Sequence, residues 1–316
     1  MRTIFRKELT DYFTSIRCFI LFLLAILISA VALYAAYQGI RGTQETGFVF
    51  LKLFTTQAQG IPSLFSFINF IAIFFIPIVG IALGFDAINR EHSEGTLSRT
   101  LSQPVFRDSV INGKFLAGMV TLSIMMAAII LIISGAGLRM IGVPPTPEEA
   151  FRLLVFLILT IIYGAFWMGL SILFSTLFRR VGTSLLSSVA LWLFLGFFYI
   201  LMIAPAIAGT LAPTADGTAE ALIHRYELQL TLQRLSPNFL FLEATSVLLQ
   251  PPLIGSLLGI IGVIASGLAS WMIPNPLSLS QCLLLIWPHL TSLIGLTIVC
   301  FAISYVLFMR QEIRAT

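Results

Sequence analysis

Charged residues are scarce in this chain. Asp, Glu, Lys and Arg make up 10% of its 316 residues, and hydrophobic residues make up 58%. Soluble domains carry roughly 25% charged residues. A water-soluble core could not bury so much apolar side chain, so the composition excludes a soluble protein and predicts an integral membrane protein.

Cysteine and histidine are also sparse, with three residues of each. Cys18, Cys282 and Cys300 lie in or beside apolar runs and form no CxxC pair, which argues against a disulfide framework. Neither His92 nor His224 has a partner at metal-ligand spacing. We therefore expect no metal site.

The motifs of common membrane enzymes and ATPases are missing as well. The sequence has no HExxH and no GxSxG, and "NGKF" at 112–115 contains Gly-Lys without the rest of a phosphate-binding loop. No acidic residue lies in the middle of an apolar run, which disfavours a proton-coupled carrier. The chain is therefore expected to be neither an enzyme nor an ATP-binding protein by itself.

What the sequence has in abundance is long apolar runs. A helix needs about 20 mostly apolar residues to cross a bilayer. Six runs meet this length, which predicts an all-α membrane protein with six transmembrane helices. The predicted spans are 18–37, 64–85, 115–138, 153–177, 184–207 and 283–308.

Basic residues set the predicted orientation. With both termini in the cytoplasm, most Lys and Arg residues fall on the cytoplasmic side, as the positive-inside rule requires. A seventh apolar run, 253–273, is bracketed by prolines. If it spanned, Arg310 and Arg314 would lie outside, so we favour a re-entrant or outer-leaflet segment over a seventh span. His289, beside Trp287, is interpreted as an interfacial anchor.

The whole chain, 1–316, is read as one transmembrane domain with three polar elaborations. Residues 208–282 form an extended extracytoplasmic region between spans 5 and 6, with helical patterns on either side of Pro237. Residues 1–17 carry an apolar stripe at helical spacing, which predicts an amphipathic helix in the headgroup layer. The third elaboration, 86–114, separates spans 2 and 3.

The polar segment 86–114 has the features of a short cytoplasmic helix. Leu97 and Leu101 lie four residues apart on one apolar face, and Pro104 ends the run. Arg107 and Lys114 are expected to reach anionic headgroups where the chain re-enters the bilayer. Such a helix is a surface that a soluble partner could bind.

Within this segment, "EGTLSRTLSQPVFRDSVINGKFLAG" at 94–118 resembles the coupling loop of ATP-binding-cassette transporter permeases of the type-2 exporter superfamily. The N-terminal "RKELTDYFTS" resembles the opening of the same proteins. Within the superfamily, the chain is most similar to permeases grouped with copper-enzyme maturation and gliding-motility transporters. The matching residues are Glu94, Gly95, Thr96, Leu97, Leu101, Ser102, Pro104, Arg107, Gly113 and Lys114 in the loop, and Lys7, Glu8, Tyr12, Phe13 and Ser15 at the N-terminus.

The resemblance implies a multi-pass permease subunit in a prokaryotic inner (plasma) membrane, acting in export. It implies two separate ABC ATPase subunits that bind ATP and Mg, a second permease subunit in a homo- or heterodimer, and no nucleic acid. The alternative is a non-transport scaffold that anchors a soluble partner. The cargo is not specified. The expected ATPase-docking residues are Glu91, Glu94, Gly95, Thr96, Leu97, Arg99, Leu101, Pro104 and Arg107, and the interfacial helix contributes Lys7, Glu8, Tyr12 and Phe13.

Overall fold

A computed structural model describes residues 2–40, 50–55, 67–93, 106–142, 144–213, 218–249 and 277–310. All regular structure in these ranges is helical, which confirms the all-α prediction. The chain forms two compact units, Met1–Ala190 with Thr291–Thr316, and Leu191–Leu290. Residues 94–105, which include most of the predicted docking residues, and the predicted re-entrant segment 253–273 lie outside the described residues.

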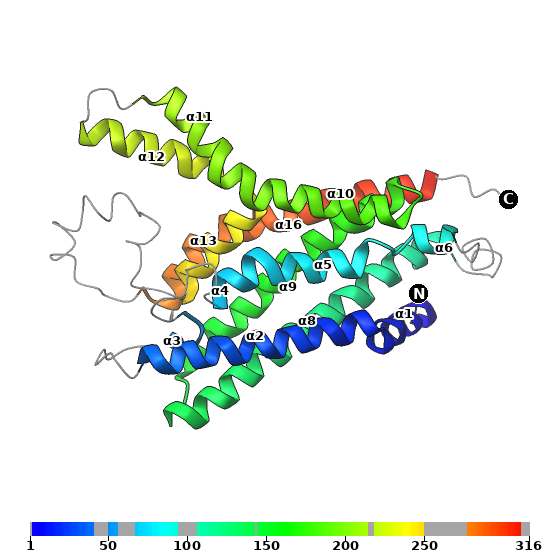
Figure 1. Ribbon diagram of the computed structural model, residues 1–316, viewed down its shortest axis with the longest axis horizontal. Helices are drawn as coiled ribbons and strands as arrows, with labels where there is room; N and C mark the ends of the chain where they lie inside the picture. The colour runs from blue at the N-terminus through cyan, green and yellow to red at the C-terminus, as the bar shows by residue number, and fades with distance from the viewer. Residues whose placement is uncertain are drawn as a thin grey trace. The chain divides into compact units, whose positions relative to one another are not determined.

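The first unit contains the helices up to Ala190 and the part of α16 that begins at Thr291 (Figure 1). α4 continues through the π-helical turn η2 into α5, and α10 and α16 each contribute the part that belongs to this unit. The elements are α1 (Arg2–Thr14), α2 (Ile16–Ile40), α3 (Lys52–Thr55), α4 (Phe67–Phe70), η2 (Ile71–Phe75), α5 (Ile76–Gly84), α6 (Asn89–Ser93), α8 (Arg107–Ile141), α9 (Pro147–Leu177), α10 (Val181–Leu193) and α16 (Leu279–Arg310).

Five stretches are long and apolar enough to cross a membrane, and a bent pair provides a sixth if it counts as one span. The bent pair is Arg2–Thr14 with Ile16–Val31, which meet at 60°. The predicted span 18–37 falls within α2, and the other five predicted spans each overlap one of the five stretches. These are Phe67–Glu91, Arg107–Met140, Pro147–Leu177, Val181–Leu211 and Leu279–Arg310.

Glycines allow α5 and α9 to pack at very short range in the core of the first unit. A Cβ atom on Gly80 would lie 2.7 Å from the Cβ of Trp167. One turn later, a Cβ on Gly84 would lie 2.8 Å from the carbonyl oxygen of Met168. In a membrane, the hydrophobic effect does not drive helices together, so they associate through close contacts between small residues such as these.

Serine hydroxyls fix the chain where α5 ends and α6 begins. Ser184 Oγ of α10 donates a hydrogen bond to the carbonyl oxygen of Phe85, at 2.8 Å. Ser175 Oγ of α9 accepts from the backbone N–H of Ile88, at 2.9 Å, and from that of Asn89, at 3.2 Å. These bonds satisfy backbone groups that a helix end leaves without partners, and they hold α6 in place for the site below.

The second unit contains η3 (Phe194–Ile203), α11 (Ala204–Leu211), α12 (Ala219–Gln233) and α13 (Pro237–Leu249), with the adjoining parts of α10 and α16. Helices thus lie on both sides of Pro237, as the sequence pattern predicts. Ser236 donates to the carbonyl oxygen of Leu195 and Gln233 to that of Ile200, so the end of α12 and the turn that follows it bind the backbone of the π-helical segment.

A buried ion cluster joins three parts of the second unit. Glu243 of α13 is 6% exposed and accepts hydrogen bonds from Arg234 and from His289 Nε2, the latter at 2.8 Å. Burial opposes ionisation of the Glu243 carboxyl group, but the bonds from Arg234 and His289 outweigh it and lower its pKa to about 2. The interpretation of His289 as an interfacial anchor is wrong, because its side chain is buried against this carboxylate.

Candidate functional site

The bend between α1 and α2 places the N-terminal helix against the end of α5 and the start of α8. Ser15, the residue at the bend, accepts a hydrogen bond from the backbone N–H of Cys18 at 3.2 Å, which caps the first turn of α2. α1 then packs along α8, where Gly113 permits a close approach. A Cβ on Gly113 would lie 3.0 Å from Ile4 Cγ2.

Lys114 is the centre of the contact between α1, α6 and α8. Its Nζ donates to Glu8 Oε1 of α1 and to Glu91 Oε1 of α6, both at 2.8 Å. The Lys114 side chain is 5% exposed, and Lys7 Nζ lies 3.8 Å from Glu8 Oε1 and 4.0 Å from Glu91 Oε1. A buried ammonium group is tolerated only when such partners compensate for its lost hydration.

This arrangement corrects one expectation from the sequence. Lys114 was predicted to reach headgroups, but its side chain turns into the protein because two carboxylates from distant segments meet there. The physical reason is that Glu8 and Glu91 lie in polar segments on either side of the first two apolar runs. When those runs fold into helices, the polar ends meet.

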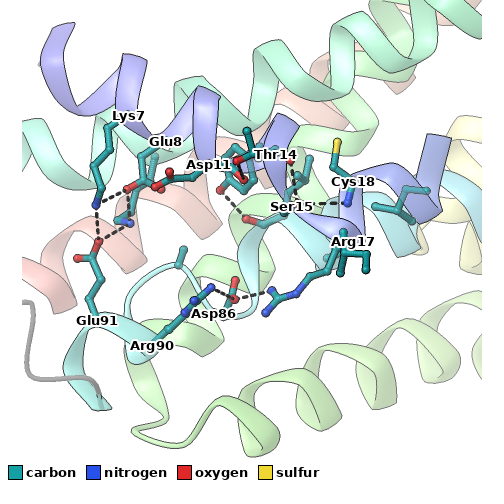
Figure 2. Close-up of a pocket in the computed structure, with 17 residues that line it drawn as sticks. Lys7, Glu8, Asp11, Thr14, Ser15, Arg17, Cys18, Asp86, Arg90 and Glu91 are labelled. Carbon is teal, nitrogen blue, oxygen red and sulfur yellow. Dashed lines mark hydrogen bonds and ion pairs between the residues drawn. The ribbon is translucent and has the colours of Figure 1, made fainter.

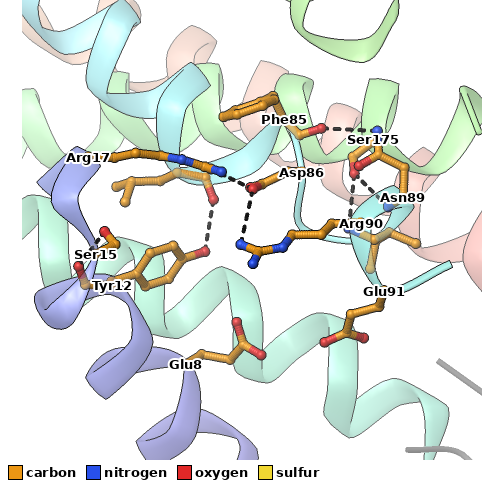
Figure 3. Close-up of polar contacts among 12 residues, drawn as sticks. Glu8, Tyr12, Ser15, Arg17, Phe85, Asp86, Asn89, Arg90, Glu91 and Ser175 are labelled. Carbon is orange, nitrogen blue, oxygen red and sulfur yellow. Dashed lines mark hydrogen bonds and ion pairs between the residues drawn. The ribbon is translucent and has the colours of Figure 1, made fainter. Parts of the chain in front are cut away.

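A second ion pair ties α2 to the end of the α5 region (Figure 3). Arg17 Nη1 donates to Asp86 Oδ2, and Arg90 Nη1 lies 3.9 Å from the same oxygen atom. The Arg17 guanidinium carbon also lies 5.1 Å from the centre of the Phe85 ring, within cation–π range. Tyr12 OH donates to the carbonyl oxygen of Leu83 at 2.8 Å, so α1 also binds the C-terminal end of α5 directly.

These contacts surround a cavity of about 590 Å³. We call its polar lining the charged cluster. Four basic and four acidic side chains belong to it, and α1, α2, α6 and α8 all contribute (Figure 2). The members are Lys7, Arg17, Arg90, Lys114, Glu8, Asp11, Asp86 and Glu91.

The structure brings part of the predicted site together. Lys7, Glu8, Tyr12 and Glu91 all line the cavity, although they come from segments about 80 residues apart in the sequence. Phe13 faces away, with 42% exposure and its ring centre 6.3 Å from that of Phe22.

Arg107 is the first residue of α8, and the residue before it, Phe106, has an extended backbone conformation. Seven of the predicted docking residues lie outside the described residues: Glu94, Gly95, Thr96, Leu97, Arg99, Leu101 and Pro104.

Sequence reasoning missed Arg17, Asp86 and Arg90 as parts of this site. The signal was present: each is a charge at the end of an apolar run, and opposite charges at neighbouring helix ends tend to pair. In the described part of the chain, no group of three or more His, Cys, Asp or Glu residues could hold a metal ion. The arrangement is that of a set of helix ends held together by charge.

Comparison with known proteins places the whole chain in context. The family model described as "ABC-2 family transporter protein" matches residues 2–313. A curated relative, the "Probable ABC transporter permease protein NosY" of Pseudomonas aeruginosa, is 27% identical over 187 residues. That match covers 58% of this chain and 58% of the relative, so the chain spans somewhat over half the length of that protein.

Proposed function

Because this chain belongs to the ABC-2 family of transporter proteins, we propose that it is the membrane-spanning permease subunit of an ATP-binding-cassette exporter. In this proposal it pairs with a second permease subunit and with two separate ATPase subunits, which bind the ATP and Mg. Both termini and the charged cluster face the cytoplasm of a prokaryotic cell, and the region 208–282 lies on the outer side.

The observation that carries the proposal is the double ion pair of Lys114. The segment 94–105 connects α6 to α8, and Lys114 joins α6 and α8 to α1 through Glu91 and Glu8. A partner that moves this segment therefore pulls on a joined assembly of three helices. If the segment were a loop without these ionic links, rotation about its backbone bonds would absorb the movement before it reached the helices.

The proposed mechanism uses no chemistry in this chain. ATP binding closes the two ATPase subunits, and their movement is passed to the docking residues around Gly95, Thr96 and Leu97. α6 transmits the displacement to α5, because Ser175 holds the connection between them. α8 receives it directly, and α1 follows through Glu8. The result is a tilt of α5 and α8 relative to their neighbours.

A matched pair of variants tests the docking assignment. Gly-Thr-Leu occurs at 95–97 and again at 209–211, at the end of α11 in the second unit. Each tripeptide is replaced by Ala-Ala-Ala in the full chain, which is then purified from membranes with its bound ATPase. The 95–97 variant should insert normally but lose most of the co-purifying ATPase, or keep it with ATP hydrolysis uncoupled from cargo movement.

The 209–211 variant should retain both ATPase binding and coupling. The docking assignment is wrong if the two variants behave alike. A wild-type chain that is stable and never purifies with an ATPase would instead support the membrane-scaffold function.

A further inference from the structure

The two sides of α1 differ in what they contact. Ile4, Glu8 and Tyr12 recur every four residues, and all three face the protein through contacts with α8 and the end of α5. Arg2 and Arg6 each lie two residues before a member of this row. Because successive residues of an α-helix are about 100° apart, the two arginines lie about 200° away from the row. We call the side of α1 that carries them the basic side.

The charges of the basic side are not neutralised by the protein. Both arginine side chains are exposed, and within the described part of the chain neither guanidinium group forms an ion pair, a hydrogen bond or a ring contact. The acidic residues of α1, Glu8 and Asp11, line the cavity of the charged cluster instead. Lys7, the third basic residue of α1, lies 3.8 Å from Glu8 and 4.0 Å from Glu91. The basic side therefore offers two positive charges to a partner outside the described chain.

Phe13 indicates where the basic side lies in the bilayer. It follows Arg6 by seven residues, or about two helical turns, so it lies on the same side of α1. Its ring is 42% exposed, and the ring centre lies 6.3 Å from that of Phe22 in the apolar helix α2. The apolar side chains of α2 that are more than half exposed include Ile16, Phe19, Ile20, Leu23 and Leu27. So much exposed apolar surface requires hydrocarbon, which places the basic side where acyl chains meet headgroups.

We propose that the basic side of α1 binds the headgroups of anionic phospholipids, such as phosphatidylglycerol. Arg2 and Arg6 bind the phosphates, because guanidinium groups donate paired hydrogen bonds to phosphate oxygens. Phe13 inserts among the upper parts of the acyl chains and keeps the helix in the plane of the interface. The net negative charge of the lipid matters, because the two arginines have no carboxylate beside them to compensate.

Lipid bound to α1 also acts on the charged cluster. Glu8 lies on the protein-facing side of the same helix and accepts a hydrogen bond from Lys114 of α8. α1 is therefore held by headgroups on one side and by α8 on the other. A membrane that binds α1 more firmly opposes displacement of α8 through this bond. This consequence rests on the proposed permease function, whereas the lipid binding itself does not.

Lipid retention by the full chain tests the proposal without any ATPase. The protein is placed in nanodiscs containing equal amounts of phosphatidylglycerol, phosphatidylethanolamine and phosphatidylcholine. It is then extracted into detergent, and the lipids that remain bound are counted by native mass spectrometry. Wild-type protein should retain phosphatidylglycerol in preference to both others, and added salt should weaken the preference by screening. Failure of the permease function would leave this result unchanged.

Neighbouring residues of α1 provide a matched pair of variants. Arg2→Gln and Arg6→Gln should each lower the retention of phosphatidylglycerol about fivefold, which is the contribution of one basic residue at an anionic membrane surface. Both arginines are exposed and unpaired, so these variants should fold as the wild type does. Lys7→Gln removes the same charge one position away, but from a group that already has two carboxylates nearby. It should change the retention little.

Three results would overturn the proposal. One is equal retention of the three lipids by wild-type protein, and another is an equal effect of Arg6→Gln and Lys7→Gln. The third comes from the double variant R2Q/R6Q purified with its ATPase. If this variant keeps the preference for phosphatidylglycerol but loses the ATPase, the basic side binds the ATPase subunit and not lipid.

Discussion

Replacing Lys114 with methionine gives the sharpest test of how the first unit is held together. Methionine keeps the length and the apolar part of the side chain but removes the ammonium group. Glu8 and Glu91, whose side chains are 11% and 14% exposed, then face each other without the cation between them. Removing one partner of a buried ion pair costs about 3–5 kcal/mol, mostly because the remaining charge is uncompensated.

The structure sets the expected value near the lower end of that range. Lys7 lies 3.8 Å from Glu8 and 4.0 Å from Glu91, so it can approach both carboxylates and compensate in part. We expect Lys114→Met to lower the free energy of unfolding by about 3 kcal/mol. Lys7→Met is the matched control, because the Lys7 side chain is 60% exposed and such surface pairs contribute about 0–1 kcal/mol.

The assay is reversible unfolding of the full chain in mixed micelles, followed by helix content. The triple variant E8Q/E91Q/K114M should regain most of the lost stability, because all three buried groups are then neutral. Coupling should behave differently: the triple variant lacks the ionic link and should remain defective in ATP-driven transport. The reasoning is refuted if Lys114→Met and Lys7→Met are equally stable, or if the triple variant is fully coupled.

Two further predictions concern other parts of the chain. Gly80→Ala should destabilise the first unit by about 1–3 kcal/mol, since its Cβ would lie 2.7 Å from that of Trp167, whereas Gly135→Ala, with open space around it, should be neutral in the same unfolding assay. In the second unit, the pKa of Glu243 is lowered from 4.5 to about 2, so its stabilising contribution is complete above pH 4.5 and is lost as the pH falls toward 2. Glu243→Gln should flatten the pH dependence of stability in that window. If the stability of the variant falls as steeply there as that of the wild type, Glu243 does not have this stabilising role.

The architecture was largely accessible from the sequence because lipid imposes simple constraints. Apolar runs long enough to span a bilayer can form only helices in a chain of this composition. The predicted spans therefore overlap helices of matching length. The N-terminal stripe predicted a helix, and the structure has α1 there, bent at Ser15 by 60° from α2.

The pairing of charges was less accessible, because it depends on which helix ends meet. The sequence around Lys114 does not distinguish a buried lysine from one whose ammonium group reaches the lipid headgroups. Its partners lie 106 and 23 residues away. His289 presents the same difficulty, since its partner Glu243 is 46 residues away and on another helix. Sequence periodicity places a residue on a helix face but does not say which helix that face meets.

The distribution of charge in the first unit explains why one site can matter so much. Only 10% of the residues in this chain are charged, so few side chains can form ion pairs. Eight of these charged side chains line one cavity. Pairs at a helix end are satisfied in one arrangement of the helices and are broken when an end moves by a few ångströms. Because Glu8, Glu91 and Lys114 belong to three helices, breaking either bond removes an ionic link between one helix and the other two. The cluster therefore makes the positions of α1, α6 and α8 mutually dependent, which is the property that the proposed ATPase-driven permease would require.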